Sequence, residues 1–171
     1  MQERNGLVTM KGNPLTLLGE EVKVGQSAPD GTLIANDLSE VKLASFKGKK
    51  WIIAAVPSLD TGICDIETKK FNTEAAKLGS DVLILTISMD LPFAQKRWCA
   101  AAGVNQVKTL SDHRDASFGS SYGVLMKGLR LLARAIFVVD TKGVVQYIEL
   151  VKEITTEPNY AAALEAVKKV K

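Results

Sequence analysis

The feature of the sequence that most constrains the fold is a pair of almost uninterrupted apolar runs. The first spans Trp51–Val56 and is stopped by Pro57, and the second spans Asp81–Ser88. Runs of this length without polar alternation are typical of strands that are covered on both faces. A segment with helical spacing separates the two runs, which favours a central sheet with helices packed on both of its faces.

Two helices are predicted around these runs. The first begins near Cys64, continues with apolar residues at helical spacing, and has Gly79 placed just beyond its end. In the second, Asp90 is placed as the N-cap, Pro92 lies in the first turn, and the helix stops at Gly103.

The other elements are shorter and are predicted from turn residues, apolar alternation and capping signals. In chain order they are an N-terminal hairpin with its turn at Gly12–Pro14, loops and short extended pieces in Gly25–Lys50, a strand near Val107–Leu110, a short helix near Ala116–Tyr122, a hairpin of Ala133–Asp140 and Val144–Leu150, and a helix from Pro158 through Val170. Together they predict an α/β fold with a central mixed sheet flanked by helices. We expect a single domain of residues 1–171, in which residues 1–25 form a hairpin extension.

Composition excludes several classes of protein. The chain has 171 residues, 46% apolar and 24% charged, with 22 Lys and Arg against 19 Asp and Glu. A chain of this length buries roughly 70% of its unfolded surface, so it needs no disulfide or structural metal for stability. The basic residues are scattered among acidic ones, which argues against a nucleic-acid surface. No apolar run approaches the ~18 residues of a membrane span, and Met1–Met10 lacks the apolar core of a signal peptide. We therefore expect a soluble cytoplasmic protein with no nucleic-acid or membrane partner.

Cys64 is the strongest candidate for a reactive group. It lies beyond the carboxyl end of the first apolar run, where ligands bind in open α/β sheets, and in the first turn of the predicted helix. The helix dipole and the free N–H groups of such a turn stabilise a thiolate. The carboxylates of Asp60, Asp65 and Glu67 oppose that effect if they face the sulfur.

A thiolate at this place needs a cation as well, because the dipole alone contributes only ~0.3–2 kcal/mol. Arg134 is the candidate, since it interrupts the apolar stretch Leu131–Val139 without an obvious packing reason. At an effective dielectric constant of about 20, a unit charge ~4 Å away contributes on the order of 4 kcal/mol. The residues alone leave two alternatives open: Arg134 caps a sheet edge, or Arg130 acts as the cation instead.

Cys99 follows Cys64 by 35 residues, which excludes a CxxC redox centre. In a reducing cytosol two cysteines are more often unrelated thiols than a disulfide, so one interpretation of Cys99 is a small buried residue. The other is that Cys99 forms a disulfide with an oxidised Cys64. Closing that loop stabilises the oxidised fold by roughly 4 kcal/mol, less any strain.

The remaining motifs carry little chemistry. The single histidine, His113, and two distant cysteines fall short of a four-ligand zinc site. We predict that His113 lies at the surface or at an interface, although a Cys–His nucleophile pair stays open. Ser117–Gly123 is glycine-rich but lacks the spacing of a phosphate-binding loop, and Trp51 and Trp98 are predicted as core or lid aromatics. No metal or cofactor is expected.

One set of residues resembles a known family. The spacing Pro57-x-x-x-Thr61-x-x-Cys64, a second cysteine on the next long helix, and Gly128-Leu129 upstream of Ala133-Arg134-Ala135 resemble the peroxiredoxins. Within them, the chain is similar to the bacterial thiol peroxidase subfamily of the atypical 2-Cys type. The resemblance extends from the N-terminal hairpin to the final helix.

The resemblance implies a thioredoxin-like fold and reduction of hydrogen peroxide and alkyl hydroperoxides. Cys64 would be the peroxidatic cysteine, and Pro57 would shield its thiolate from bulk water. Thr61 would hydrogen-bond the thiolate and the peroxide, and Arg134 would stabilise the thiolate and polarise the O–O bond. Cys64 would become a sulfenic acid, Cys99 would resolve it as an intramolecular disulfide, and thioredoxin would reduce that disulfide.

The resemblance also implies a homodimer, with Asp112–Tyr122 as the expected contact. Gly62 departs from the family pattern, in which a bulkier residue or proline is expected, and this loosens the turn before Cys64. Two other functions compete with a peroxidase. A redox sensor would use the same cysteine pair once for each signal, and a thioredoxin-type oxidoreductase is disfavoured by the missing CxxC. A purely structural domain would leave Thr61, Cys64 and Arg134 unexplained.

Overall fold

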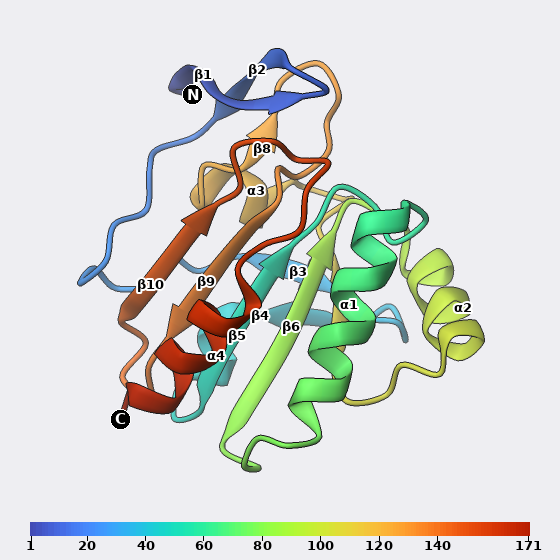
Figure 1. The fold of residues 1–171 in the computed structure, drawn as a ribbon, viewed down its shortest axis with the longest axis vertical. Helices are drawn as coiled ribbons and strands as arrows, with labels where there is room; N and C mark the ends of the chain where they lie inside the picture. The colour runs from blue at the N-terminus through green and yellow to red at the C-terminus, as the bar shows by residue number, and fades with distance from the viewer.

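A seven-stranded mixed sheet forms the centre of the protein in a computed structural model that describes residues 1–171 (Figure 1). Its strand order is β10-β9-β5-β6-β7-β3-β4, in which β5, β6 and β7 are parallel and the other pairs antiparallel. The strands are β3 (Thr32–Ile34), β4 (Glu40–Lys42), β5 (Lys50–Ala55), β6 (Val82–Ser88), β7 (Lys108–Ser111), β9 (Ala135–Val139) and β10 (Val145–Leu150). The predicted α/β class with a mixed central sheet is confirmed.

Helices and a small second sheet surround this sheet. The helices are α1 (Gly62–Ala75), α2 (Pro92–Ala102), α3 (Ser117–Ser121) and α4 (Tyr160–Lys169), with a 3₁₀ turn at Leu43–Phe46. The second sheet joins the N-terminal hairpin of β1 (Glu3–Met10) and β2 (Asn13–Leu18) to β8 (Leu125–Met126). In Figure 1, α1 and α4 lie on one face of the central sheet and the hairpin lies beyond one end of its strands. None of the helices is long and apolar enough to cross a membrane.

Two apolar cores explain why the strand runs lack polar alternation. Along β5, Trp51, Ile53 and Ala55 belong to a core shared with the hairpin and α3. The alternate residues Ile52 and Ala54 belong to a second core, shared with α1, α2 and α4. Because successive side chains of a strand point to opposite faces, a strand covered on both faces takes mainly apolar residues along its whole length.

The end of the first helix differs from the prediction. α1 ends at Ala75, and the last backbone bonds, from Lys77 to Glu74 and from Leu78 to Ala75, are i to i−3. These tight turns, rather than α-helix, lead up to Gly79, which therefore is not the residue just beyond the helix.

The predicted cap of α2 is also wrong, although Pro92 is in the first turn and Gly103 ends the helix with a left-handed φ of 66°. The N-cap residue is Leu91, whose side chain makes no capping hydrogen bond. Asp90 instead accepts hydrogen bonds from the loop after β5, where Ser58 supplies a hydroxyl donor. A donor from outside the helix competes successfully with the helix for this carboxylate.

The turn of the N-terminal hairpin lies one residue earlier than predicted. Lys11 and Gly12 form it, with φ of 50° and 79°, and Met10 pairs with Asn13 across the hairpin. Two successive positive φ values match the twist of hairpin strands, and Gly12 adopts such a value without strain.

Gly19 is the glycine that packing most restricts. Its φ is +101°, and a Cβ atom there would overlap the carbonyl oxygen of Ser120. The backbone at the end of the hairpin packs directly against the backbone of α3 at this point. Position 19 therefore admits only glycine.

We predict that Gly19→Ala lowers the free energy of unfolding by about 1–3 kcal/mol, because it adds a steric overlap to an unfavourable φ. Urea titration of the purified protein measures this change. Gly62→Ala is the matched control, since Gly62 has open space around it and no left-handed φ. A Gly19→Ala protein as stable as the Gly62→Ala protein contradicts the prediction.

Candidate active site

The β5–α1 connection places Cys64 at the carboxyl end of the parallel strands. β5 ends at Ala55, Pro57 is buried, and α1 begins at Gly62, so Cys64 lies in the first turn of the helix. Its side chain has no exposed surface. The predicted position of Cys64 in a helical first turn is therefore confirmed, and the thiol lies within the protein rather than on its surface.

Thr61 holds the sulfur of Cys64 from one side. The Thr61 hydroxyl lies 2.7 Å from Cys64 Sγ and 2.8 Å from the carbonyl oxygen of Ser58. A hydroxyl has one proton, which it gives to the carbonyl when Cys64 is a thiol and to the sulfur when Cys64 is a thiolate. Thr61 is the N-cap residue of α1 but makes no side-chain capping bond, so its hydroxyl is free for this exchange.

Arg134 approaches the same sulfur from the other side. Its Nη2 lies 3.4 Å from Cys64 Sγ, and its Nε donates to the carbonyl of Ile154 at 3.0 Å. Opposite unit charges at this separation attract by about 5 kcal/mol at an effective dielectric constant of about 20. Arg134 therefore does not cap a sheet edge; it is 1% exposed and directed at the thiol.

Glu67 completes the surroundings of Arg134. Its Oε2 accepts a hydrogen bond from Arg134 Nη1, and its side chain has no exposed surface. Burial raises the pKa of Glu67 to about 7, although Arg134 lowers it. Burial also disfavours the Arg134 cation, but Glu67 and Cys64 beside it raise the pKa of Arg134 above its ordinary value, so it stays charged.

The role of Glu67 was missed because the sequence alone leaves its direction open. Its spacing was the available signal, since residues i and i+3 share a helix face, and Cys64, Glu67 and Phe71 are all buried on α1. Asp65 turns away instead, to the indole N–H of Trp98 at 3.1 Å and to Lys69 at 2.8 Å. Of the three carboxylates expected to oppose the thiolate, Glu67 therefore holds the cation and Asp65 bonds elsewhere. Asp60 is exposed, and its carboxylate lies 3.7 Å from Arg97.

A second carboxylate fixes the loop that precedes α1. Asp90 accepts hydrogen bonds from the Ser58 hydroxyl at 2.7 Å, the Leu59 N–H at 2.8 Å and the Ser88 hydroxyl at 2.7 Å. Ser88 in turn accepts from Gln95 of α2 at 3.0 Å. These bonds tie the cysteine loop to the start of α2.

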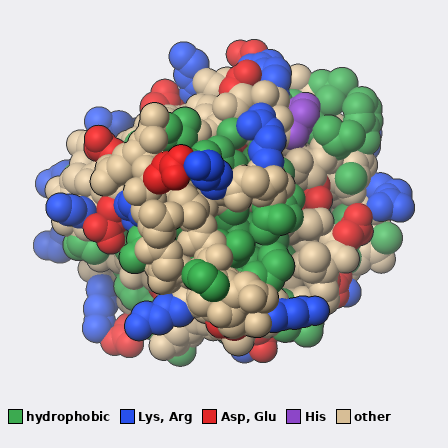
Figure 2. Space-filling model, turned by 90° about the horizontal axis from the view of Figure 1, so that it is seen from above, with side chains coloured by type: hydrophobic (Ala, Val, Ile, Leu, Met, Phe, Trp, Pro, Cys, Tyr) green, Lys and Arg blue, Asp and Glu red, His purple; other side chains and the backbone are tan.

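A cavity of about 520 Å³ opens beside Cys64. Pro57, Thr61 and Arg134 line it, together with apolar side chains of the hairpin, of α1 and of the segment after β10: Met10, Ile63, Ile66 and Ile154. The face toward which β5 and β6 run is seen in Figure 2, where apolar side chains gather at the centre and charged ones lie around them. The cavity thus has a polar contact point at Thr61 and Arg134 and mainly apolar walls.

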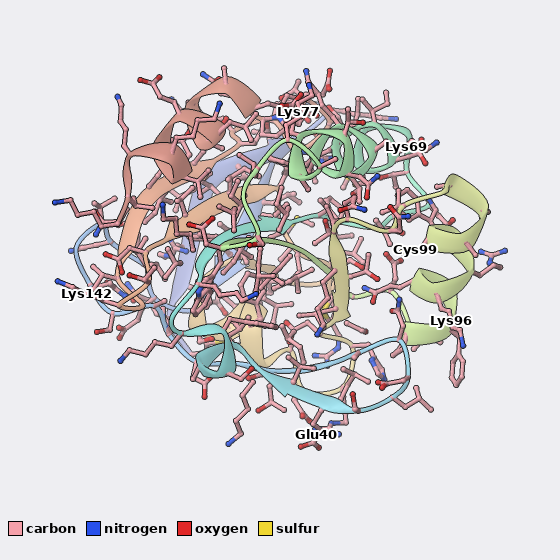
Figure 3. The ribbon with its side chains drawn as sticks, turned by 90° about the horizontal axis from the view of Figure 1, so that it is seen from below. Glu40, Lys69, Lys77, Lys96, Cys99 and Lys142 are labelled. Atoms are coloured by element: carbon pink, nitrogen blue, oxygen red, sulfur yellow. The ribbon has the colours of Figure 1, made fainter.

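Cys99 lies in a different environment on α2 (Figure 3). Both cysteines are free thiols, and Cys99 Sγ lies 3.5 Å from Thr109 Oγ1. Cys99 is partly exposed and borders a separate polar cavity of about 500 Å³. The indole of the neighbouring Trp98 connects α2 to Asp65 of α1, so the helices that carry the two cysteines are in contact.

The other candidate residues make no hydrogen bond to Cys64, whose sulfur contacts Thr61 and Arg134. Arg130 is exposed and influences the buried Asp112, so it does not compete with Arg134. His113 bonds to Ser111 at 2.9 Å. Within the expected dimer contact, Phe118 is already buried in the core of this chain, which leaves mainly the exposed residues of that stretch for a second copy.

Comparison with known proteins agrees with this fold. Residues 23–164 match the redoxin family. The chain is 60% identical to a thiol peroxidase of Halalkalibacterium halodurans over 94% of its length and 96% of that protein, and 58% identical to a thiol peroxidase of Bacillus subtilis over 94% and 96%. A peroxiredoxin-like protein from Aquifex aeolicus has a crystal structure that superposes with a TM-score of 0.90, at 43% identity and over 99% of both chains.

The chain belongs to the redoxin family. Within that family, its resemblance to the bacterial thiol peroxidases of the peroxiredoxin superfamily is confirmed. A thiol peroxidase from Chromobacterium violaceum, at 20% identity and a TM-score of 0.84 over 95% of both chains, shares the fold.

We predict that Glu67→Gln weakens the pH dependence of stability between about pH 4.5 and pH 7. Because burial raises the pKa of Glu67 from 4.5 to about 7, the folded protein binds more protons than the unfolded chain in this window. The free energy of unfolding therefore falls as the pH rises. Glutamine does not ionise, so in the variant the fall in the free energy of unfolding over this pH range is smaller by up to roughly 3 kcal/mol.

Urea unfolding at about pH 5 and about pH 7.5 measures the difference in stability between the two conditions. Glu74→Gln, which removes a carboxylate paired with Lys77 at the surface of the same helix, is the control. Equal pH dependence in the Glu67→Gln and Glu74→Gln proteins would show that Glu67 does not titrate in this range.

Proposed function

We propose that the protein is a thiol-dependent peroxidase that reduces hydrogen peroxide and organic hydroperoxides at Cys64. The observation that carries the proposal is the buried Cys64 sulfur, held 2.7 Å from Thr61 and 3.4 Å from Arg134 at the side of a cavity. The names of the relatives that are 60% and 58% identical support it.

The first step of the proposed reaction is oxidation of Cys64. The thiolate attacks one peroxide oxygen, so that an S–O bond forms while the O–O bond breaks. The leaving oxygen takes a proton and departs as water or an alcohol, and the sulfur becomes a sulfenic acid. Charge moves from sulfur to the leaving oxygen, and the donors of Thr61 and Arg134 are placed where they favour that movement over ground-state binding. Pro57 covers the sulfur against bulk water.

The second step is resolution by Cys99. Its sulfur attacks the sulfenic sulfur of Cys64, the S–S bond forms, and the S–O bond breaks with release of water. A dithiol partner of the thioredoxin type then reduces the disulfide, becoming oxidised itself and returning both thiols. We propose that Cys99 is the resolving residue because α1 and α2 are joined through Asp65 and Trp98.

Resolution requires both cysteine segments to rearrange. Cys64 is enclosed and bound to Thr61 and Arg134, while Cys99 lies beside Thr109. Two sulfurs bond only when their Cα atoms come within about 7 Å with the correct geometry. The first turn of α1 must therefore open, and Gly62, with open space around it, imposes little resistance.

A homodimer and a cytoplasmic location complete the proposal. Of the expected contact, Arg114 and Asp115 remain exposed, and a second copy would meet the chain there. Size-exclusion chromatography with light scattering measures the oligomeric state directly.

We predict that Cys64→Ser abolishes peroxide consumption, whereas Cys99→Ser consumes a single equivalent and stops as a sulfenic acid. Stopped-flow mixing with hydrogen peroxide and with an organic hydroperoxide, followed by tryptophan fluorescence, measures each step. Trp98 adjoins Cys99 and bonds to Asp65, so its emission reports disulfide formation. Multiple turnovers with a thioredoxin system support a peroxidase, and one turnover per protein would indicate a redox sensor instead. A wild-type thiol that reacts no faster than free cysteine contradicts the proposal.

We also predict that disulfide formation loosens two segments, the first turn of α1 and the part of α2 around Cys99. Amide hydrogen exchange in the reduced and the oxidised protein compares their protection. Amides of α4 are the internal control, since none of the bonds that must break involves this helix. Identical protection of both cysteine segments in the two forms would argue against local unfolding.

A further inference from the structure

The carboxylate of Glu153 gathers five hydrogen-bond donors from two segments. From the hairpin, Thr9 Oγ1 donates at 2.8 Å, and the N–H groups of Lys11 and Gly12 each donate at 3.0 Å. From its own loop, the hydroxyl of Thr155 donates at 2.6 Å and its N–H at 3.2 Å. Hydrogen bonds from Thr155, Gly12 and Thr9 hold the pKa of Glu153 below its ordinary value, so the carboxylate is charged at neutral pH.

The hairpin turn that Glu153 binds has a strained residue. Lys11 adopts a φ of 50°, which is unfavourable for residues other than glycine, and Gly12 follows with a φ of 79°. Positive φ values at both positions turn two successive N–H groups toward one point. A strained backbone conformation persists only when surrounding interactions stabilise it. Here the N–H groups of Lys11 and Gly12 both donate to the Glu153 carboxylate, which stabilises the turn.

Backbone bonds beside Glu153 extend the connection to the active site. The N–H of Thr9 donates to Lys152 at 2.7 Å, and the N–H of Ile154 donates to Thr9 at 3.0 Å. The carbonyl of Ile154 accepts the bond from Arg134 Nε. Glu153, which binds the hairpin turn, is thus adjacent in the chain to Ile154, whose carbonyl orients the guanidinium of Arg134.

The hydrogen bonds between Glu153 and the hairpin turn join the two segments that form one side of the cavity beside Cys64. Met10 and Lys11 line the cavity from the hairpin, and Ile154 and Thr155 line it from the loop. Two of these four residues, Lys11 and Thr155, donate hydrogen bonds to Glu153, and Ile154 adjoins it in the chain. The hairpin is also anchored at β8, where Leu17 pairs with Met126, and through the backbone bonds of Thr9. At the turn itself, the Glu153 carboxylate is what binds the N–H groups of Lys11 and Gly12.

We propose that Glu153 is a positioning residue that fixes the hairpin side of the cavity and thereby sets the preference for organic hydroperoxides over hydrogen peroxide. The inference rests on the peroxidase function proposed above. Hydrogen peroxide is small enough to contact only the groups around the Cys64 sulfur. The carbon group of an organic hydroperoxide extends further, and its apolar contact with Met10 exists only while the turn is held.

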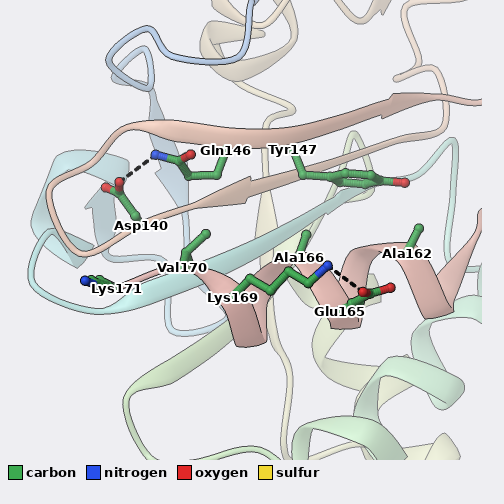
Figure 4. Close-up of a pocket in the computed structure, with 9 residues that line it drawn as sticks. All are labelled: Asp140, Gln146, Tyr147, Ala162, Glu165, Ala166, Lys169, Val170 and Lys171. Atoms are coloured by element: carbon green, nitrogen blue, oxygen red, sulfur yellow. Dashed lines mark hydrogen bonds and ion pairs between the residues drawn. The ribbon is translucent and has the colours of Figure 1, made fainter.

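The experiment compares kcat/KM for cumene hydroperoxide and for hydrogen peroxide in the wild type and three variants. Glu153→Ala removes the attachment, Glu153→Gln keeps one accepting oxygen, and Met10→Ala removes the apolar wall alone. Glu165→Ala is the control, because Glu165 lies on α4 in a distant groove and pairs only with Lys169 at the surface (Figure 4).

In Glu153→Ala and in Met10→Ala we expect kcat/KM for cumene hydroperoxide to fall about tenfold through a higher KM, the effect of losing one apolar contact. For hydrogen peroxide we expect a change of less than about twofold. Glu153→Gln should fall between wild type and Glu153→Ala, and Glu165→Ala should match the wild type. Amide exchange at Lys11 and Gly12 should become faster in Glu153→Ala and stay unchanged in Met10→Ala and Glu165→Ala.

Two results would overturn the inference while leaving the peroxidase function standing. One is an unchanged ratio of the two kcat/KM values in Glu153→Ala. The other is an equal loss with both substrates, which would mean that Glu153 acts through Arg134 or through stability. A wild-type protein that reduces neither peroxide would instead overturn the proposed function, and this inference with it.

Discussion

The buried guanidinium of Arg134 is the interaction on which the rest of the site depends. A buried charge is destabilising unless its donors are satisfied. Here Cys64, Glu67 and the carbonyl of Ile154 satisfy them from a helix and from the segment after β10. One cation therefore ties α1 and that segment to the central sheet, and loss of any partner leaves the others around an incompletely bonded charge.

Carboxylates also hold two loops around this centre, the loop before α1 and the hairpin turn. Asp90 binds donors of the loop before α1, and Glu153 binds donors of the hairpin turn. Both attachments are hydrogen bonds at the edge of the apolar cores rather than contacts within them. Loops held in this manner open at a lower free energy than the core strands, so rearrangement near Cys64 does not require disruption of the sheet.

The sequence was sufficient for the features that depend on local pattern. The apolar run of β5 predicted a strand covered on both faces, and the residues around Cys64 predicted a thiol in the first turn of a helix. The contact of that thiol with Arg134, 70 residues along the chain, was left open by the residues alone. The capping role assigned to Asp90 was wrong, because its partner Ser58 belongs to a loop 32 residues away. Glu153 meets its partners in the hairpin only in the folded protein, since they lie more than 140 residues away along the chain, and no periodicity or spacing signals such a contact.

The enclosure of Cys64 has a consequence for redox equilibrium. In the proposed cycle, the bonds from Thr61 and Arg134 to its sulfur exist only in the reduced, folded site. Interactions confined to the reduced form of a cysteine pair raise its reduction potential and make its disulfide more oxidising. The geometry that prepares the thiol for oxidation would therefore also favour electron flow back into the disulfide, since reduction restores the bonds that oxidation removed.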